Sequence, residues 1–290
     1  MKLLAKFNLI FILVMALGVA VSGWISHGLL QAQAREEVVG TGRLMMEKAL
    51  AVRSYTTNHI AKLLQTQMQY EFLPQSVPSF SATEVLSTLQ KSYPQFGYKE
   101  ATLNPTNPRD RAVDWEVDIV NSFRSNAELK ELVGVRDTPT GASLYVARPL
   151  RITNPACLQC HSSVEAAPKT MVEKYGPANG FGWQLNEVVG AQVVSVPMEL
   201  PLKRANDNFK LFISALIGVF VVVGIVLNLM IWTVVVRPVT QLSELADRVS
   251  QGDLAAPEFA TSGKDEIAVL AQSFSRMRAS VVQAMKMLDN

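Results

Sequence analysis

Two long apolar stretches constrain the fold of this chain more than any other feature of its sequence. They occupy residues 7–30 and 211–236, and each reaches the roughly 20 residues that an α-helix needs to cross a bilayer. Hydrophobic residues make up 49 % of the 290 residues and charged residues only 18 %, a balance typical of membrane segments. The sequence therefore predicts two transmembrane helices, with a buried core helix as the weaker alternative for the second stretch.

The residues beside the first apolar stretch predict the orientation of the chain. Lys2 and Lys6 precede it, and basic residues favour the cytoplasmic side. Two spans then place the intervening residues outside the cytoplasm and return the C-terminal part to it. Ala32-Gln33-Ala34 resembles a cleavage site, so a cleaved signal peptide is the alternative. We favour an anchor because the stretch exceeds a signal-peptide core of about 7–15 residues.

The motif C-x-x-C-H occurs once, at Cys157-Leu158-Gln159-Cys160-His161, and it contains both cysteines of the chain. Two thiols at this spacing can form thioethers with the two vinyl groups of one porphyrin, and the following imidazole can bind the iron. The sequence thus predicts haem c, with Cys157 and Cys160 as covalent attachment points and His161 as the proximal iron ligand. The predicted topology puts the motif outside the cytoplasm, where haem is attached.

Other uses of the same residues remain alternatives. A thioredoxin-like dithiol or disulfide also uses C-x-x-C, but it does not need the histidine that follows. A zinc site would need about four ligands, and the chain has only three histidines and two cysteines, which are far apart in sequence. The net charge of +2 is too small to indicate nucleic-acid binding, so we expect no nucleic-acid partner.

The part between the apolar stretches is predicted to be an α+β domain. Residues 31–67 favour a long helix that continues from the first span, and a further helix is expected around residues 112–123. Residues 143–150 and 188–197 have the β-branched composition of strands. The haem motif lies between these two strands, so loops are expected to hold the cofactor.

The part after the second apolar stretch favours two short amphipathic helices. The first covers residues 238–251 and stops at Gly252-Asp253-Leu254. The second starts at Asp265-Glu266-Ile267 and has apolar residues at heptad a and d positions, namely Ile267, Leu270, Phe274, Met277 and Val281. Two such helices cannot bury their apolar stripes alone, whereas four helices from two chains can. We therefore expect a homodimer.

Two resemblances to known families follow from these motifs. The stretch with Pro238, Gly252-Asp253-Leu254 and Asp265-Glu266-Ile267 resembles a HAMP domain, a dimeric relay between a membrane helix and a cytoplasmic output. The external part resembles single-haem c-type sensor domains of bacteria and cyanobacteria, which have a PAS-like core. The motifs that carry this second resemblance are residues 51–56, 98–107, 157–162 and 180–183, with the strand at 189–197.

The sensor family implies a haem held against the first helix, with His161 on its proximal side. Some members use a cysteine of that helix as the distal ligand, and this chain has no cysteine to spare. Met46 is the first alternative, because a thioether binds haem iron well; packing in the core is its other possible role. His59 comes second, and Met45, Met68 and His27 follow. A vacant distal site open to a small gas remains a further alternative.

The predicted segments are a cytoplasmic N-terminus (1–6), a first transmembrane helix (7–30), a periplasmic c-type haem PAS-like domain (31–208), a second transmembrane helix (211–236) and a HAMP domain (237–290). This organisation predicts a two-pass protein of the plasma membrane with both termini in the cytoplasm. We expect a haem sensor that signals to a separate cytoplasmic protein, without an enzymatic activity of its own. A membrane-anchored monohaem electron carrier is the alternative function.

Overall fold

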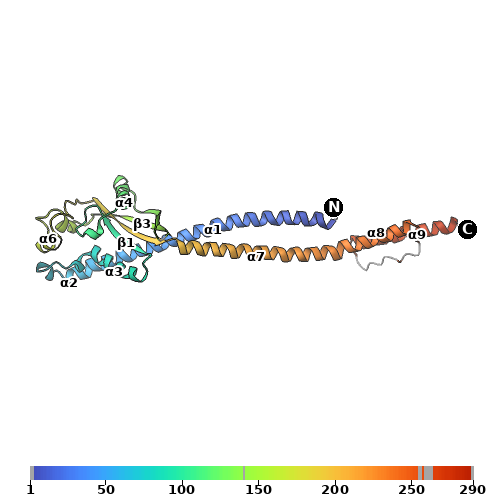
Figure 1. The fold of residues 1–290 in the computed structure, drawn as a ribbon, viewed down its shortest axis with the longest axis horizontal. Helices are drawn as coiled ribbons and strands as arrows, with labels where there is room; N and C mark the ends of the chain where they lie inside the picture. Colours follow the sequence, from blue (N-terminus) through green and yellow to red (C-terminus); the bar gives the residue numbers. More distant parts are fainter. Residues whose placement is uncertain (1–2, 140, 254–256, 258–263, 289–290) are drawn as a thin grey trace. The chain divides into compact units, whose positions relative to one another are not determined.

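The computed structural model describes residues 3–139, 141–253, 257 and 264–288. The chain divides into two compact units, one formed by Gly28–Asn208 and the other by Met1–His27 with Phe209–Asn290. Helix α1 (Leu3–Tyr55) is continuous from the first apolar stretch into the unit Gly28–Asn208 (Figure 1). The predicted continuation of the first span as a long helix is thus confirmed.

A four-stranded antiparallel sheet lies at the centre of the unit Gly28–Asn208. Its strands are β1 (Gly97–Thr102), β2 (Leu132–Thr138), β3 (Gly141–Arg151) and β4 (Val188–Pro197), in the order β1-β4-β3-β2. Strand β4 pairs Val194 with Val146 of β3 and Ala191 with Ala101 of β1. The two predicted strands correspond to β3 and β4. The PAS-like assignment stays a prediction.

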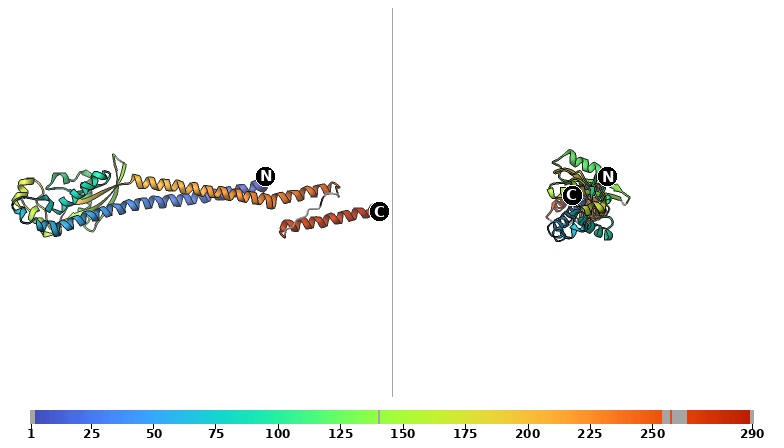
Figure 2. Two further views of the ribbon diagram at one scale, coloured as in Figure 1. Left: turned by 90° about the horizontal axis from the view of Figure 1, so that it is seen from below. Right: turned by 90° about the vertical axis from the view of Figure 1, so that its left-hand side faces the viewer.

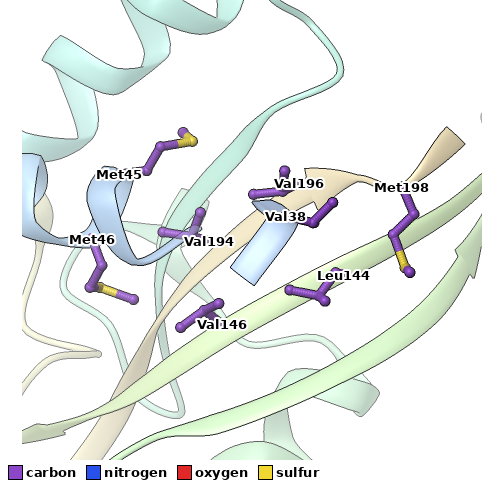
Figure 3. Packing of buried hydrophobic residues seen from close by; sticks show 8 residues of the cluster. All are labelled: Val38, Met45, Met46, Leu144, Val146, Val194, Val196 and Met198. Atoms are coloured by element: carbon purple, nitrogen blue, oxygen red, sulfur yellow. The ribbon is translucent and has the colours of Figure 1, made fainter. Parts of the chain in front are cut away.

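Both faces of the sheet are covered by helices, and successive residues of β3 and β4 point to opposite faces. On one face, residues of α1 pack against the sheet in a closed cluster (Figure 3). Its members are Val38, Met45, Met46, Leu144, Val146, Val194, Val196 and Met198. On the other face, α4 (Asp114–Ser125) packs Ile119, Val120 and Phe123 against Ala147 and Val193. Because β4 is buried on both faces, it reads as a continuous apolar run.

Apart from α3, the remaining helical segments of this unit are short. The π-helix η1 (Thr56–Ile60) follows α1 directly and leads into α2 (Ala61–Leu63). Three 3₁₀ turns, η2 (Gln67–Gln69), η3 (Pro74–Ser76) and η4 (Pro108–Asp110), flank helix α3 (Pro78–Ser92). The predicted helix of residues 31–67 therefore changes from α to π geometry after Tyr55. The helix expected at 112–123 is α4, displaced by two residues.

The unit formed by Met1–His27 and Phe209–Asn290 is helical. Helix α7 (Glu199–Ile231) continues through the π-helix η6 (Trp232–Val236) into α8 (Arg237–Ser250). Within the described residues, two helices are long and apolar enough to span a membrane (Figure 2). They lie within Leu4–Leu63 and Glu199–Ser250, and their most apolar windows have mean hydropathies of 2.4 and 2.7. The membrane topology itself stays a prediction.

Helix α8 ends as the sequence predicts, at a glycine with a left-handed backbone. Gly252 has φ of +94°, and the N–H groups of Gly252 and Asp253 donate to the carbonyls of Val249 and Arg248 at 3.1 and 3.0 Å. Helix α9 (Glu266–Leu288) starts after Asp265, whose carboxylate accepts from the Ala268 N–H at 2.9 Å. Leu254 of the predicted stop and most of the connector lie outside the described residues.

Candidate functional site

The C-x-x-C-H motif is positioned by a short turn after strand β3. Asn154 begins the 3₁₀ turn η5 (Pro155–Cys157), because its side chain accepts from the Ala156 N–H at 2.9 Å. One helical turn, α5 (Leu158–His161), follows. The helical spacing brings Cys157, Cys160 and His161 to one side of this turn.

The imidazole of His161 is held by a backbone carbonyl. Its Nδ1 lies 2.7 Å from the oxygen of Gly180. Because a carbonyl only accepts hydrogen bonds, Nδ1 must carry the proton, and Nε2 is left with its lone pair for a metal. Burial lowers the pKa of His161, against the opposing effect of the Gly180 hydrogen bond. The neutral imidazole, which is the form able to bind a metal ion, is therefore favoured.

A second contact fixes the plane of the same ring. The indole of Trp183 stacks on the imidazole of His161, with ring centroids 4.0 Å apart and planes inclined by 15°. The N–H of Trp183 also donates to the carbonyl of His161 at 3.1 Å. The ring can neither tilt nor rotate without loss of one of these contacts, so its orientation is set before any ligand binds.

The loop that carries Gly180 is tied to the segment that follows β1. The carboxamide of Asn104 accepts from the Gly180 N–H at 3.2 Å and donates to the Phe181 carbonyl at 3.3 Å. Gly180 has φ of +86°, and a Cβ there would lie 2.0 Å from Oγ1 of Thr106. Only glycine fits this position. The structure thus brings together three of the motifs that carry the family resemblance.

The two cysteines are free thiols, each partly buried. Burial raises the pKa of Cys160, and the neighbouring Cys157 adds to this shift. Cys160 packs against an apolar cluster beside the motif, formed by Phe72, Ala167, Met171, Met68, Val77, Val172, Tyr175 and Phe181; Met171, Val172 and Tyr175 belong to α6 (Lys169–Tyr175). Among the residues that the structure describes, no three His, Cys, Asp or Glu side chains gather to bind a metal ion. The donor set therefore fits haem c, with an apolar wall for the porphyrin, better than it fits a zinc site.

Family models match two parts of the chain. The Tll0287-like family matches residues 31–197, which is more than half of the 290 residues. The chain belongs to the Tll0287-like family. A HAMP domain matches residues 231–283. Both resemblances predicted from the sequence are confirmed at this level, and the Tll0287-like domain precedes the HAMP domain.

One solved structure, that of the cyanobacterial heme-protein Tll0287, is similar to the Tll0287-like domain. It is 17 % identical, with a TM-score of 0.44, over 56 % of this chain and 95 % of its own. A likeness this weak supports no assignment of residues. No curated protein matches the chain.

The candidates for the distal ligand lie in different surroundings within the Tll0287-like domain. Met46 is fully buried in the sheet-facing cluster of Figure 3, whereas Cys160 belongs to a separate cluster. The sulfur of Met68, beside Cys160, accepts hydrogen bonds from the Leu73 N–H at 3.1 Å and from Oγ of Ser76 at 3.3 Å. Distal ligation by Met46 stays a prediction, and so do the roles of the motif residues.

The three remaining candidates differ in their surroundings, and of these only Met45 packs with Met46. His59 is exposed on the π-helix η1 and stacks on Tyr55, with ring centroids 5.0 Å apart. Met45 packs in the same cluster as Met46. His27 belongs to the other unit, where it contacts Phe209 edge to face at 5.2 Å. The structure therefore does not describe where His27 lies relative to the C-x-x-C-H motif.

Sequence reasoning missed the residues that hold the imidazole of His161. Asn104, Thr106, Gly180 and Trp183 belong to motifs that the sequence singles out, yet no role could be given to them. The hydrogen bond from His161 to Gly180 joins residues 19 positions apart. The local sequence pattern of neither segment predicts it. The two glycines in Gly180-Phe181-Gly182 are the only sequence signal, because they mark backbone that other residues rarely adopt.

Proposed function

We propose that this protein is a membrane-anchored sensor that carries haem c through Cys157 and Cys160, with His161 as the proximal ligand. The observation that carries the proposal is the neutral, preoriented imidazole of His161 beside two free thiols. The similar solved structure is that of a heme-protein, which supports the same cofactor. When bound, the haem supplies an iron centre whose charge or axial ligation can change.

The HAMP match supports a signalling role for the helices after the haem domain. We propose that the haem domain is periplasmic, that both termini are cytoplasmic, and that a change at the site alters the packing of α1 and α7. The HAMP helices then repack and act on a separate cytoplasmic protein. Signalling, and not catalysis, is the role that this arrangement supports.

A homodimer is part of the proposal. On α9, the apolar residues Leu270, Met277 and Val281 are 49, 56 and 42 % exposed. The contact between α8 and α9 buries only a few small or apolar side chains, among them Leu242, Ala268 and Ala271. The exposed stripe needs a cover in water, and a second copy supplies an identical stripe for a parallel four-helix bundle.

The cofactor is tested on full-length protein made in a host with cytochrome-maturation machinery. Haem that stays on the polypeptide after denaturing electrophoresis, with a haem c spectrum, is the expected result. The variant Cys157→Ser with Cys160→Ser is the control and should lose the stain. A wild-type chain without covalent porphyrin would overturn the proposal.

The relay is tested by disulfide cross-linking of Met277→Cys in oxidised and reduced membranes. Two copies that repack should cross-link at different rates in the two states. Equal rates would contradict a relay and favour the electron carrier, particularly if removal of the residues after Pro238 left electron exchange unchanged. Ser273→Cys, at an exposed polar position of α9, controls for thiol reactivity.

A further inference from the structure

A buried chain of polar contacts joins the end of α1 to strands β1 and β4. The guanidinium of Arg53 donates to Oε2 of Glu100. The hydroxyl of Tyr98 donates to the other oxygen, Oε1, at 2.7 Å, and the Gln192 amide donates to the Tyr98 hydroxyl at 3.2 Å. Glu100 and Gln192 are directly opposite in the β1–β4 register. Both carboxylate oxygens therefore have partners.

This chain of polar contacts holds two opposite charges away from water. The side chain of Glu100 is 4 % exposed and that of Arg53 is 26 % exposed. Burial lowers the pKa of Arg53, but the attraction of Glu100 outweighs it and the net pKa is raised. Burial and the Glu100 charge together raise the pKa of Tyr98, which stays a hydrogen-bond donor. The low dielectric around the pair strengthens its field on its surroundings.

The pair lies at the end of the domain that holds the haem motif. Arg53 belongs to the last turn of α1 before η1, and η1 packs against η3. The residues on either side of η3, Phe72 and Val77, pack in the same cluster as Cys160.

We propose that the Arg53–Glu100 pair is a positioning element that sets the reduction potential of a haem attached at Cys157 and senses its charge through the end of α1. This inference rests on the proposed function. Arg53 belongs to the turn of α1 that leads directly into η1, the segment that packs towards the Cys160 cluster, so its positive charge disfavours ferric iron. The carboxylate offsets part of that effect. Because Glu100 belongs to β1 and Arg53 to α1, any change in their attraction acts on the junction between helix and sheet.

The inference predicts opposite effects for the two members. In Glu100→Gln the uncompensated Arg53 charge favours the ferrous state, so the potential rises. In Arg53→Gln the remaining Glu100 charge favours the ferric state, so the potential falls. A unit charge in a partly buried site changes the ratio of reduced to oxidised haem on the order of tenfold at fixed potential, which is about 59 mV for one electron.

The test is a potentiometric titration of the haem spectrum on the full chain. Arg53→Lys keeps the charge and should stay near the wild-type potential, and the double variant Arg53→Gln with Glu100→Gln should fall between the single variants. The matched control is Arg43→Gln, which removes an exposed ion pair of α1 with Glu131 and should leave the potential unchanged.

The outcomes separate this inference from the proposed function. Two results would overturn the inference and leave the haem assignment intact, provided that the single variants keep covalent haem. In the first, the ratio of reduced to oxidised haem at a fixed potential changes less than twofold. In the second, both variants shift the reduction potential in the same direction. A wild-type chain without haem would overturn the proposed function instead. If a single variant fails to fold, Arg53→Lys and Tyr98→Phe remain: the phenol donates to Glu100, and its loss should lower the potential by strengthening the carboxylate charge.

Discussion

The sheet-facing cluster of α1 and the loops between β3 and β4 are held together in different ways. The cluster around Met46, Leu144, Val146 and Val194 is fully buried and contains only apolar side chains. The loops around His161 are held by backbone and asparagine hydrogen bonds, with positive φ at Gly176, Gly180, Gly182 and Asn186. The comparison teaches that hydrophobic burial holds α1 against the sheet in this cluster, whereas hydrogen bonds and glycine backbone conformations give the loops a shape that suits a binding site.

The largest expected effect is that of removing the haem attachment, which should change the loops and leave the sheet unchanged. Cys157→Ser with Cys160→Ser should abolish covalent haem and leave the sheet folded. Hydrogen exchange should accelerate on the order of tenfold in the loops between β3 and β4, while the amides of β3 and β4 keep their protection. Equal acceleration in both regions would show that the sheet also depends on the cofactor.

Truncation of a core side chain should destabilise the sheet and leave the haem site unchanged. Phe123→Ala removes a fully buried ring from the α4 face of the sheet, and such changes cost about 3–5 kcal/mol of unfolding free energy. Thermal unfolding should show the loss, while the haem spectrum of the folded fraction stays that of the wild type. A changed spectrum would mean that α4 also positions the cofactor.

The backbone at Gly180 links the loops to His161, the predicted proximal ligand. Gly180→Ala places a Cβ against Thr106 at a positive φ, so the loop must move and the His161 hydrogen bond must lengthen. We expect an altered haem spectrum in addition to lower stability. Gly176→Ala is the control, because Gly176 has φ of +81° but no atom within 4 Å of an added Cβ. It should cost about 1 kcal/mol and leave the spectrum unchanged.

A partly buried carboxyl of η4 makes the stability of the domain depend on pH. Burial raises the pKa of Asp110 from 3.8 to about 6, although Arg109 opposes the shift. The folded state therefore holds the proton more tightly than the unfolded state, and this stabilisation is lost as the pH rises from about 4 through about 6. Asp110→Asn should flatten the dependence, by at most about 3 kcal/mol, in unfolding at pH 4 and pH 7. Asp118→Asn, on the exposed face of α4, should keep the wild-type dependence.

The smallest expected change in stability tests Met46. Leucine conserves the volume of the side chain, so Met46→Leu should change the unfolding free energy by less than about 1.5 kcal/mol. If the thioether is the distal ligand, the variant should lose the spectrum of a methionine-ligated haem. An unchanged spectrum would restrict Met46 to packing in the sheet-facing cluster. Met45→Leu is the control for repacking of the same cluster.

The sequence predicts those parts of the fold whose cause is local. Strand β4 is predicted over its full length, because a run of β-branched residues needs no partner to be recognised. Strand β1 (Gly97–Thr102) was missed, since Lys99 and Glu100 make it read as polar. The structure explains these charges, because Lys99 pairs with Glu116 at 2.7 Å and Glu100 pairs with Arg53 on the opposite face.

The candidate site likewise has a part that the sequence predicts and a part that depends on contacts between distant residues. The attachment motif is five consecutive residues, so the sequence predicts it directly. The ion pairs Lys99–Glu116 and Arg53–Glu100, in contrast, join residues that lie far apart in the sequence. Glu100 and Arg53 are 47 residues apart, and such pairs depend on the packing of a helix on a sheet. No spacing rule connects Arg53 with Glu100, so only the structure shows that the two residues pair.

The π-helical turn η6 (Trp232–Val236) holds one residue more than an α-helical turn would, with the Arg237 N–H donating to the Trp232 carbonyl. Each residue gained or lost by an α-helix rotates everything beyond it by about 100°. Relaxation of this turn to α geometry would thus swing the apolar stripe of α8 by more than a quarter of a circle without breaking the helix. The direction in which α8 faces is governed by the winding of five residues, and a single deletion among them should lock it.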